Sequence, residues 1–242
     1  MKSTVATIFA VAILGASLFL AHAYKTRGDR PGQVAVTGSG SITFESDKIV
    51  WSGTFTTKNA DLTTAFAQIK SDREIIEKYL KQRGVSPNEI SFRQVRTSEA
   101  TKAQYSEKGN YIGSEFYAYE LRQDVVIESR DLDGITAISR EISELLKDGV
   151  QITSNFPEYY YSELESLKLN LIEKASENGR IRAEQIAKNS KSSIVGLKNA
   201  RLGVFQILGY NSGESYSWSG TFNTSSRWKT ASITVKMDFE VE

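Results

Sequence analysis

The feature that most constrains the fold is a strict two-residue alternation at the end of the chain. Residues 233–241 place an apolar side chain at every second position. This period predicts a strand with one buried face. Residues 34–44 alternate in the same way, but Gly38 and Gly40 interrupt the apolar side. Glycine at such positions predicts a bulge or close backbone packing, so the body is expected to begin and end in a sheet.

Apolar residues recur at helical spacing in three segments between these two strands. Asp61 is placed to cap a helix that Gly84 closes. Asp131 or Asp133 caps a second, shorter helix. The longest helix is predicted from about residue 159 to residue 190, with one apolar stripe along its length.

The remaining strands complete a mixed order. They are predicted at residues 48–57, 90–95, 117–127, 150–156 and 195–208. The strand at 48–57 should form a hairpin with the strand before it, across a turn at Ser46-Asp47. Residues 98–113 are polar and contain glycine, which predicts a long hairpin loop. The resulting order, ββαββαβαββ, indicates an α+β fold with helices on one face of a mostly antiparallel sheet.

The start of the chain differs from the body. Lys2 precedes an uncharged apolar run over residues 4–20, which Ala21-His22-Ala23 follows. A cleavable signal peptide fits the lysine, the apolar run and the A-x-A pattern. An uncleaved anchor also fits, because residues 4–23 supply about the 20 residues that cross a bilayer as a helix.

Both interpretations divide the chain in the same way. Residues 1–23 form the signal peptide or N-terminal membrane anchor, and residues 24–32 form a cationic linker that ends in Pro31-Gly32. Residues 33–242 form the folded body, within which two weakly related halves each carry a main helix and a hairpin. The membrane is a partner through residues 4–23 only if the leader is not cleaved.

The composition excludes several kinds of chemistry. His22 is the only histidine, and cysteine is absent. The body therefore has no Ser-His or Cys-His mechanism and no histidine or cysteine ligand for a metal. Asp131-x-Asp133-Gly134 is similar to the start of a calcium loop, but Arg140 falls where the bidentate glutamate belongs. We expect no enzymatic activity, cofactor or metal, although a mechanism that uses carboxylates alone stays open.

The charge balance argues against nucleic acid as a partner. The chain has 30 basic and 29 acidic residues, a formal net charge of +1. Nucleic-acid binding needs a broad positive field, and this composition does not supply one.

Two aromatic clusters are the candidate contact or interface residues. Tyrosines at 159–161 form a binding ledge or pack a helix against a sheet. Residues 209–228 carry aromatics in a Gly- and Ser-rich background, which suits partner or saccharide contacts or a mobile loop folded over its own sheet. The candidates are Tyr159, Tyr160, Tyr161, Tyr210, Tyr216, Trp218, Phe222 and Trp228.

Three stretches in this order resemble the SIMPL domain family of bacterial exported proteins. They are the Val-Ala-Val-Thr-Gly-Ser-Gly-Ser-Ile strand at 34–42, the Tyr-Tyr-Tyr-Ser-Glu-Leu segment with the Ala-bearing helix after it, and the closing strand at 231–241. The chain departs from the family at Ser46-Asp47, where Pro-Asp is usual, and at Asn178-Gly179, where the helix is usually richer in alanine.

The resemblance implies a location and a way of working. The family's location is the bacterial envelope, on the periplasmic side, and its members tend to assemble into ring- or channel-like homo-oligomers linked to stress tolerance. It carries no established catalytic residues. We therefore expect a non-enzymatic envelope protein that self-assembles. The alternative is a periplasmic binding module for a small molecule, saccharide or protein, which uses the aromatic loop at 209–228.

Overall fold

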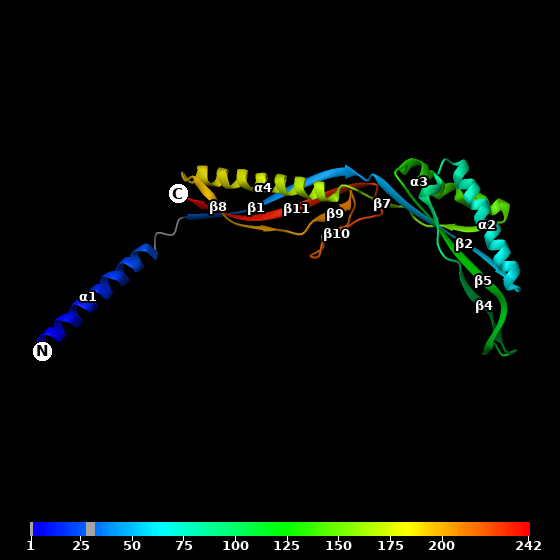
Figure 1. Cartoon of the computed structure of the whole chain (residues 1–242), viewed down its shortest axis with the longest axis horizontal. Coiled ribbons are helices and arrows are strands. Elements are labelled where there is room, and N and C mark those ends of the chain that lie inside the picture. Colours follow the sequence, from blue (N-terminus) through cyan, green and yellow to red (C-terminus); the bar gives the residue numbers. More distant parts are fainter. Residues whose placement is uncertain (1, 28–31) are drawn as a thin grey trace. The chain divides into compact units, whose positions relative to one another are not determined.

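The computed structural model describes residues 2–27 and 32–242, with side chains described for residues 10–25 and 32–242 (Figure 1). The elements in chain order are α1 (Lys2–Arg27), β1 (Gly32–Glu45), β2 (Lys48–Asn59), α2 (Leu62–Gln82), the 3-10 turn η1 (Pro87–Glu89), β3 (Ile90–Phe92), β4 (Arg96–Tyr105), β5 (Tyr111–Ser129), α3 (Leu132–Glu141), the 3-10 helix η2 (Ile142–Asp148), β6 (Gln151–Ser154), β7 (Glu158–Tyr160), α4 (Leu164–Asn189), β8 (Ile194–Leu202), β9 (Gln206–Gly209), β10 (Thr221–Phe222) and β11 (Trp228–Val241). Helices packed on two mostly antiparallel sheets confirm the predicted α+β class.

The described chain divides into two compact units, each built from segments distant in sequence. The first unit contains the residues up to Ser41, Leu169–Phe205 and Ser232–Glu242. The second contains Ile42–Lys168 and Gln206–Ala231. One sheet has the order β1-β11-β9-β10, with β8 also paired to β11, and the other has the order β3-β5-β2-β6, with β4 on β5 and β7 on β2. The suggested duplication of halves stays a prediction.

In the first unit, α4 packs directly on the backbone of β1. The side of α4 that is buried carries mostly small residues at every fourth position, such as Ala175, Gly179 and Ala183. A Cβ added to Gly38 would lie 2.6 Å from the Gly179 nitrogen, and a Cβ on Gly40 would lie 2.6 Å from the Leu171 carbonyl oxygen. The predicted close backbone packing at the two strand glycines is therefore confirmed.

The same contact explains the Asn178-Gly179 departure in α4. A Cβ on Gly179 would lie 3.3 Å from the Gly38 backbone. Beside it, the Asn178 side-chain oxygen accepts a hydrogen bond from the Ser39 amide at 3.1 Å. One turn further along, Arg182 donates to the Thr37 carbonyl at 2.9 Å. Gly179 itself costs a helix about 1 kcal/mol relative to alanine. The two polar contacts join α4 to β1 on either side of this glycine.

The predicted hairpin between β1 and β2 is wrong. β1 pairs with β11 in one sheet, whereas β2 lies in the other sheet between β5 and β6. At the turn between them, the Ser46 amide donates to the Arg227 carbonyl and the Asp47 amide donates to the Tyr160 carbonyl. The amides of Ser46 and Asp47 therefore bind other segments and do not close a turn between β1 and β2. The chain leaves one sheet at this break and enters the other.

The second unit has a core between β2, β5 and the helices α2 and α3. Trp51, Phe55 and Ile127 are fully buried there. The Trp51 indole donates to the Ser154 hydroxyl at 3.0 Å, which satisfies its one polar atom. β2 pairs with β5 from Ile49, opposite Ser129, to Asn59, opposite Tyr119.

The helix caps predicted for α2 and α3 are confirmed. Asp61 accepts a hydrogen bond from the Thr64 amide at 2.7 Å, and Asp131 accepts one from the Gly134 amide at 2.9 Å. Gly84 has a φ of +87°, the left-handed conformation that ends a helix. Asp131, not Asp133, is therefore the cap of α3.

The long loop predicted at residues 98–113 is wrong. β4 and β5 continue as a two-stranded ribbon through most of this segment, and only the residues between Tyr105 and Tyr111 turn. The side chains of β4 are exposed except Ala100. A ribbon with no buried face needs no apolar alternation, so the pattern carries no strand signal there.

Two further boundaries differ from the prediction. α4 begins at Leu164, because Tyr159 and Tyr160 belong to the short strand β7. The strand predicted at 195–208 is interrupted near Gly203, which separates β8 from β9. A Cβ on Gly203 would lie 2.7 Å from the Thr234 hydroxyl, so the strand also approaches β11 closely at this point.

The N-terminal segment is helical over Lys2–Arg27, and its described side chains, residues 10–25, are exposed. None of the helices in the described part of the chain combines the length and the apolar character that a membrane span needs. The spanning anchor predicted at residues 4–23 is therefore not confirmed. The predicted linker at 24–32 lies partly outside the described residues, which omit residues 28–31.

Candidate functional site

The structure brings parts of the two predicted aromatic clusters together. The Tyr159 amide of β7 donates to the Thr224 carbonyl at 2.7 Å. The rings of Tyr160 and Phe222 lie 6.3 Å apart. Part of the segment at 209–228 therefore lies against β7, which belongs to the sheet of β2 and not to the sheet of the flanking strands β9 and β11.

The three tyrosines of the first cluster are each half-buried and each has a neighbour. Tyr159 packs against the core of the second unit, and its hydroxyl lies 3.0 Å from that of Thr136. The Tyr161 ring lies 4.7 Å from the Phe44 ring. Tyr160 donates to Glu158 at 2.8 Å, and this bond, together with burial, raises the pKa of Tyr160. These contacts favour packing over ligand binding as the role of the cluster.

The aromatics of the second cluster are more open. Trp218 is fully exposed, Tyr216 is 70% exposed and Tyr210 is 53% exposed. Phe222 and Trp228 are each nearly half exposed. Large apolar side chains with this exposure are the most accessible contact groups among the residues predicted from sequence.

A partly buried polar network links the residues of the segment that carries these aromatics. Gln206 donates to the Ser217 carbonyl at 2.6 Å and accepts from the Ser217 amide at 3.2 Å, so one side chain satisfies both backbone groups. Glu214 accepts from the Gly209 amide at 2.9 Å, and Asn223 donates to the same carboxylate. The bond from Gly209 is the main cause of the lowered pKa of Glu214. Side-chain hydrogen bonds therefore fix the backbone on both sides of Trp218.

Lys229 lies under the same segment and was not predicted from sequence. The side chain of this β11 lysine is fully buried, and its ammonium donates to the Ser226 carbonyl. Burial lowers the pKa of Lys229 to about 8, against the opposing attraction of Glu214. Its position in the alternation of β11 assigns it to the apolar face, which is the one sequence signal that could have indicated burial.

A hollow of about 460 Å³ adjoins the two clusters. Tyr159 and Ser225 line it, together with Arg140 and Phe156. Phe156 is 95% exposed. Phe156 stands beside Pro157 in a polar segment. A single apolar residue forms no repeating pattern, so the sequence does not indicate its exposure.

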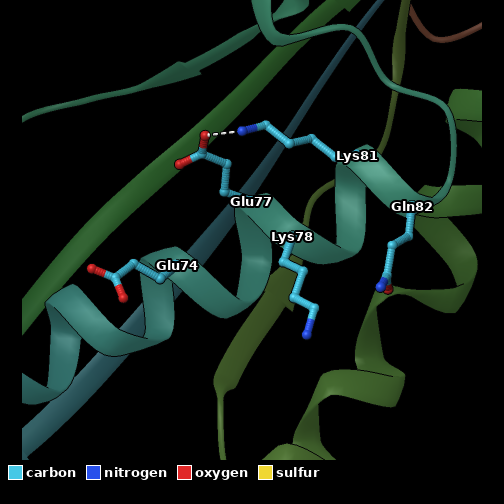
Figure 2. Close-up of a pocket in the computed structure, with 5 residues that line it drawn as sticks. All are labelled: Glu74, Glu77, Lys78, Lys81 and Gln82. Atoms are coloured by element: carbon cyan, nitrogen blue, oxygen red, sulfur yellow. Dashed lines mark hydrogen bonds and ion pairs between the residues drawn. The ribbon is translucent and has the colours of Figure 1, made fainter.

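A second hollow, of about 500 Å³, lies along α2 and carries no clear site (Figure 2). Its five labelled side chains all come from one surface of the helix. Glu77 and Lys81 pair with each other at 2.6 Å, one turn apart. Such a row of charges is typical of a solvated helix face.

Within the described part of the chain, no three His, Cys, Asp or Glu side chains gather as metal ligands. The expected lack of a catalytic centre or cofactor stays a prediction. The Asp131-Asp133 pair is explained without a metal, since Asp131 caps α3 and Asp133 pairs with Arg227.

A comparison with known families gives a match for the body of the chain. Residues 34–240 match the family described as SIMPL, protein of unknown function (DUF541). The chain belongs to the SIMPL family. No curated protein matches the chain. The family assignment covers nearly all of the body, from the first strand of the first unit to the last, and it supplies no activity.

Proposed function

We propose that this SIMPL protein is a non-enzymatic envelope protein that works by assembling into a homo-oligomer. The leader supports export, because its lysine, apolar run and A-x-A pattern are those of a signal peptide. The proposed location is the periplasmic side of a bacterial envelope, with a role in envelope or stress tolerance.

The observation that carries the assembly proposal is the β8 edge of the first unit. Within the described residues, β8 pairs with β11 and with no second strand. Val195, Leu197 and Leu202 on this edge are each between 55% and 58% exposed. A long apolar edge strand is a site of pairing unless another element covers it. A second copy of the chain is the partner that covers the edge in a homo-oligomer.

Further exposed apolar groups on α4 support the same proposal. Leu169 is 69% exposed, while Ile181 and Ile186 are about 45% exposed. If the β8 edge of one copy meets a different surface of the next, the contact is head-to-tail and closes into a ring when the rotation permits. A ring or channel is therefore the form of assembly that we propose.

Light scattering coupled to size-exclusion chromatography tests the assembly. The chain without residues 1–31 should elute as a multiple of its own mass, and Leu197→Glu should shift it toward the protomer because a charge cannot be buried unpaired at the contact. The matched control is Leu146→Glu, since Leu146 is 56% exposed but lies in the second unit. Equal masses for the two variants would refute β8 as the contact.

The second candidate function is a binding module that uses the aromatic segment at 209–228. The full exposure of Trp218 above a braced network favours it. Isothermal titration calorimetry with purified cell-wall saccharide fragments would show binding in the parent and loss in Trp218→Ala, with no change in oligomer mass. Phe156→Ala removes another exposed aromatic and should leave binding intact. Loss of binding in both variants, or in neither, would reject this role for Trp218.

A further inference from the structure

The second unit carries a polar hollow on the face of its sheet opposite the helices. Along β2, Ser52 and Thr54 alternate with the buried Trp51, so they point away from α2 and α3. On the neighbouring strand β5, Asp124 lies directly opposite Thr54 and Val126 lies opposite Ser52. These residues and their neighbours line a hollow of about 490 Å³.

Three arginines enter this hollow. Arg96 of β4 lies directly opposite Arg122 of β5 in the register of the ribbon. Arg93 lies just before β4, where its amide donates to the Asp124 carbonyl at 2.9 Å, and its side chain lines the same hollow. Like charges directly opposite each other destabilise an antiparallel pair. An anion between the guanidinium groups would remove this repulsion.

Among the residues that the structure describes, acidic side chains pair with two of the three arginines and not with the third. Asp124 accepts a hydrogen bond from a threonine hydroxyl at 2.8 Å and lies 3.5 Å from Arg96. Arg122 binds Glu120 at 2.7 Å. For Arg93, no ion pair or hydrogen bond of the guanidinium is found within the described residues. Its forked donors are therefore available to a ligand.

Most of the remaining lining offers neutral contacts. The Ser52 hydroxyl oxygen accepts a hydrogen bond from the Asn155 side-chain nitrogen at 3.0 Å. The hydroxyl hydrogen of Ser52 is therefore available to an outside acceptor. The side chains of Val50 and Val126 are half-buried and form an apolar part of the lining. Glu158 also lines the hollow, where its carboxylate accepts a hydrogen bond from Tyr160 and keeps its negative charge. The arginines Arg93, Arg96 and Arg122 outnumber the two acids of the lining, Asp124 and Glu158.

We propose that this hollow binds a small phosphate or sulfate ester whose body is neutral and carries hydroxyl groups. Arg93 and Arg96 hold the oxyanion, because a guanidinium presents parallel N–H donors that match two oxygens of such a group. Ser52 and Asn155 contact the hydroxyl-bearing body. The site lies in the second unit, so it does not depend on the β8 contact.

Isothermal titration calorimetry on the full chain tests the site with four probes: glucose 1-phosphate, glucose 6-sulfate, inorganic phosphate and glucose. One of the two esters should bind saturably, more tightly than inorganic phosphate, and glucose should not bind. A preference between the esters distinguishes phosphate from sulfate as the natural group. The affinity should fall as salt is added, since the contact is between charges.

Matched variants separate the site from general charge. Arg93→Gln should lower the affinity for the ester about tenfold or more, as expected for a lost hydrogen bond to a charged group. Arg93→Lys keeps the charge without the fork and should bind with intermediate affinity. Arg130→Gln removes the same charge from an exposed position of the same unit, outside both the hollow and the β8 edge. It should leave the affinity within about twofold.

Three results would overturn the proposal. They are no saturable binding of either ester at millimolar concentration, binding of glucose as tight as that of the esters, and equal losses in Arg93→Gln and Arg130→Gln. An unchanged melting temperature of Arg93→Gln shows that any loss is not due to unfolding. Arg93 is exposed, so we expect the variant to fold.

Discussion

Replacing Gly38 by alanine should destabilise the first unit, because the new methyl group meets helix backbone. The added Cβ would lie 2.6 Å from the Gly179 nitrogen and closer still to the Ala175 carbonyl oxygen. Neither atom can rotate away as a side chain can, so α4 must shift from β1. Overpacking of this kind costs about 1–3 kcal/mol, and the backbone contact places this case near about 3 kcal/mol.

Thermal unfolding followed by far-UV circular dichroism measures the effect. For a chain of this size, about 3 kcal/mol corresponds to a fall in melting temperature of roughly 6–12 °C. Tryptophan fluorescence is a poor probe here, because Trp51, Trp218 and Trp228 all belong to the second unit.

The matched control for this prediction is Gly196→Ala in β8 of the same unit. No atom lies within 4 Å of a Cβ added there. Alanine at such an open site restricts the unfolded chain and should leave stability unchanged or raise it by up to about 1 kcal/mol. Equal melting temperatures for Gly38→Ala and Gly196→Ala would show that Gly38 is not needed for the close contact between β1 and α4.

Three further predictions concern single contacts. Ser154→Ala leaves the Trp51 indole N–H without its partner and should cost about 1–3 kcal/mol in urea unfolding; an unchanged midpoint would contradict the role of that bond. Lys229 has its pKa lowered to about 8 when folded, while an unfolded lysine titrates near ~10.4, so the unfolded state binds more protons between these pH values. Stability should therefore rise across that range by at most ~1.4 kcal/mol per pH unit, and a Lys229→Met variant that kept the same rise would exclude this lysine as its source. Asp61→Ala removes the cap that accepts from the Thr64 amide, and should lower the free energy of unfolding by about 1 kcal/mol, with no effect if the cap is dispensable.

The elements that could be predicted from sequence are those whose signal is local. The alternation of β11, the cap at Asp61 and the left-handed glycine at Gly84 each follow from a few neighbouring residues, and the structure confirms them. The glycines of β1 were also read correctly as close packing. Their partner in α4 could not be identified, since it lies more than 130 residues away and contributes backbone atoms.

What could not be predicted depends on pairing between distant segments. The alternation of β1 and β2 is compatible with a hairpin, and only the bonds from Ser46 and Asp47 to other strands decide against it. The β4–β5 ribbon has no buried face and so no period to find. The arginine hollow could not be predicted for a related reason. Arg93 and Arg122 are 29 positions apart in the sequence, and only the pairing of the strands brings them to one hollow.

The measurement that tests the central claim most directly is the mass of the folded body in solution. Light scattering on the chain without residues 1–31, at micromolar concentration and moderate salt, should give an integral multiple of the protomer mass. Leu197→Glu should reduce that mass and Leu146→Glu should not. A parent protein that stays strictly monomeric under these conditions would contradict the claim that this SIMPL protein works by self-assembly.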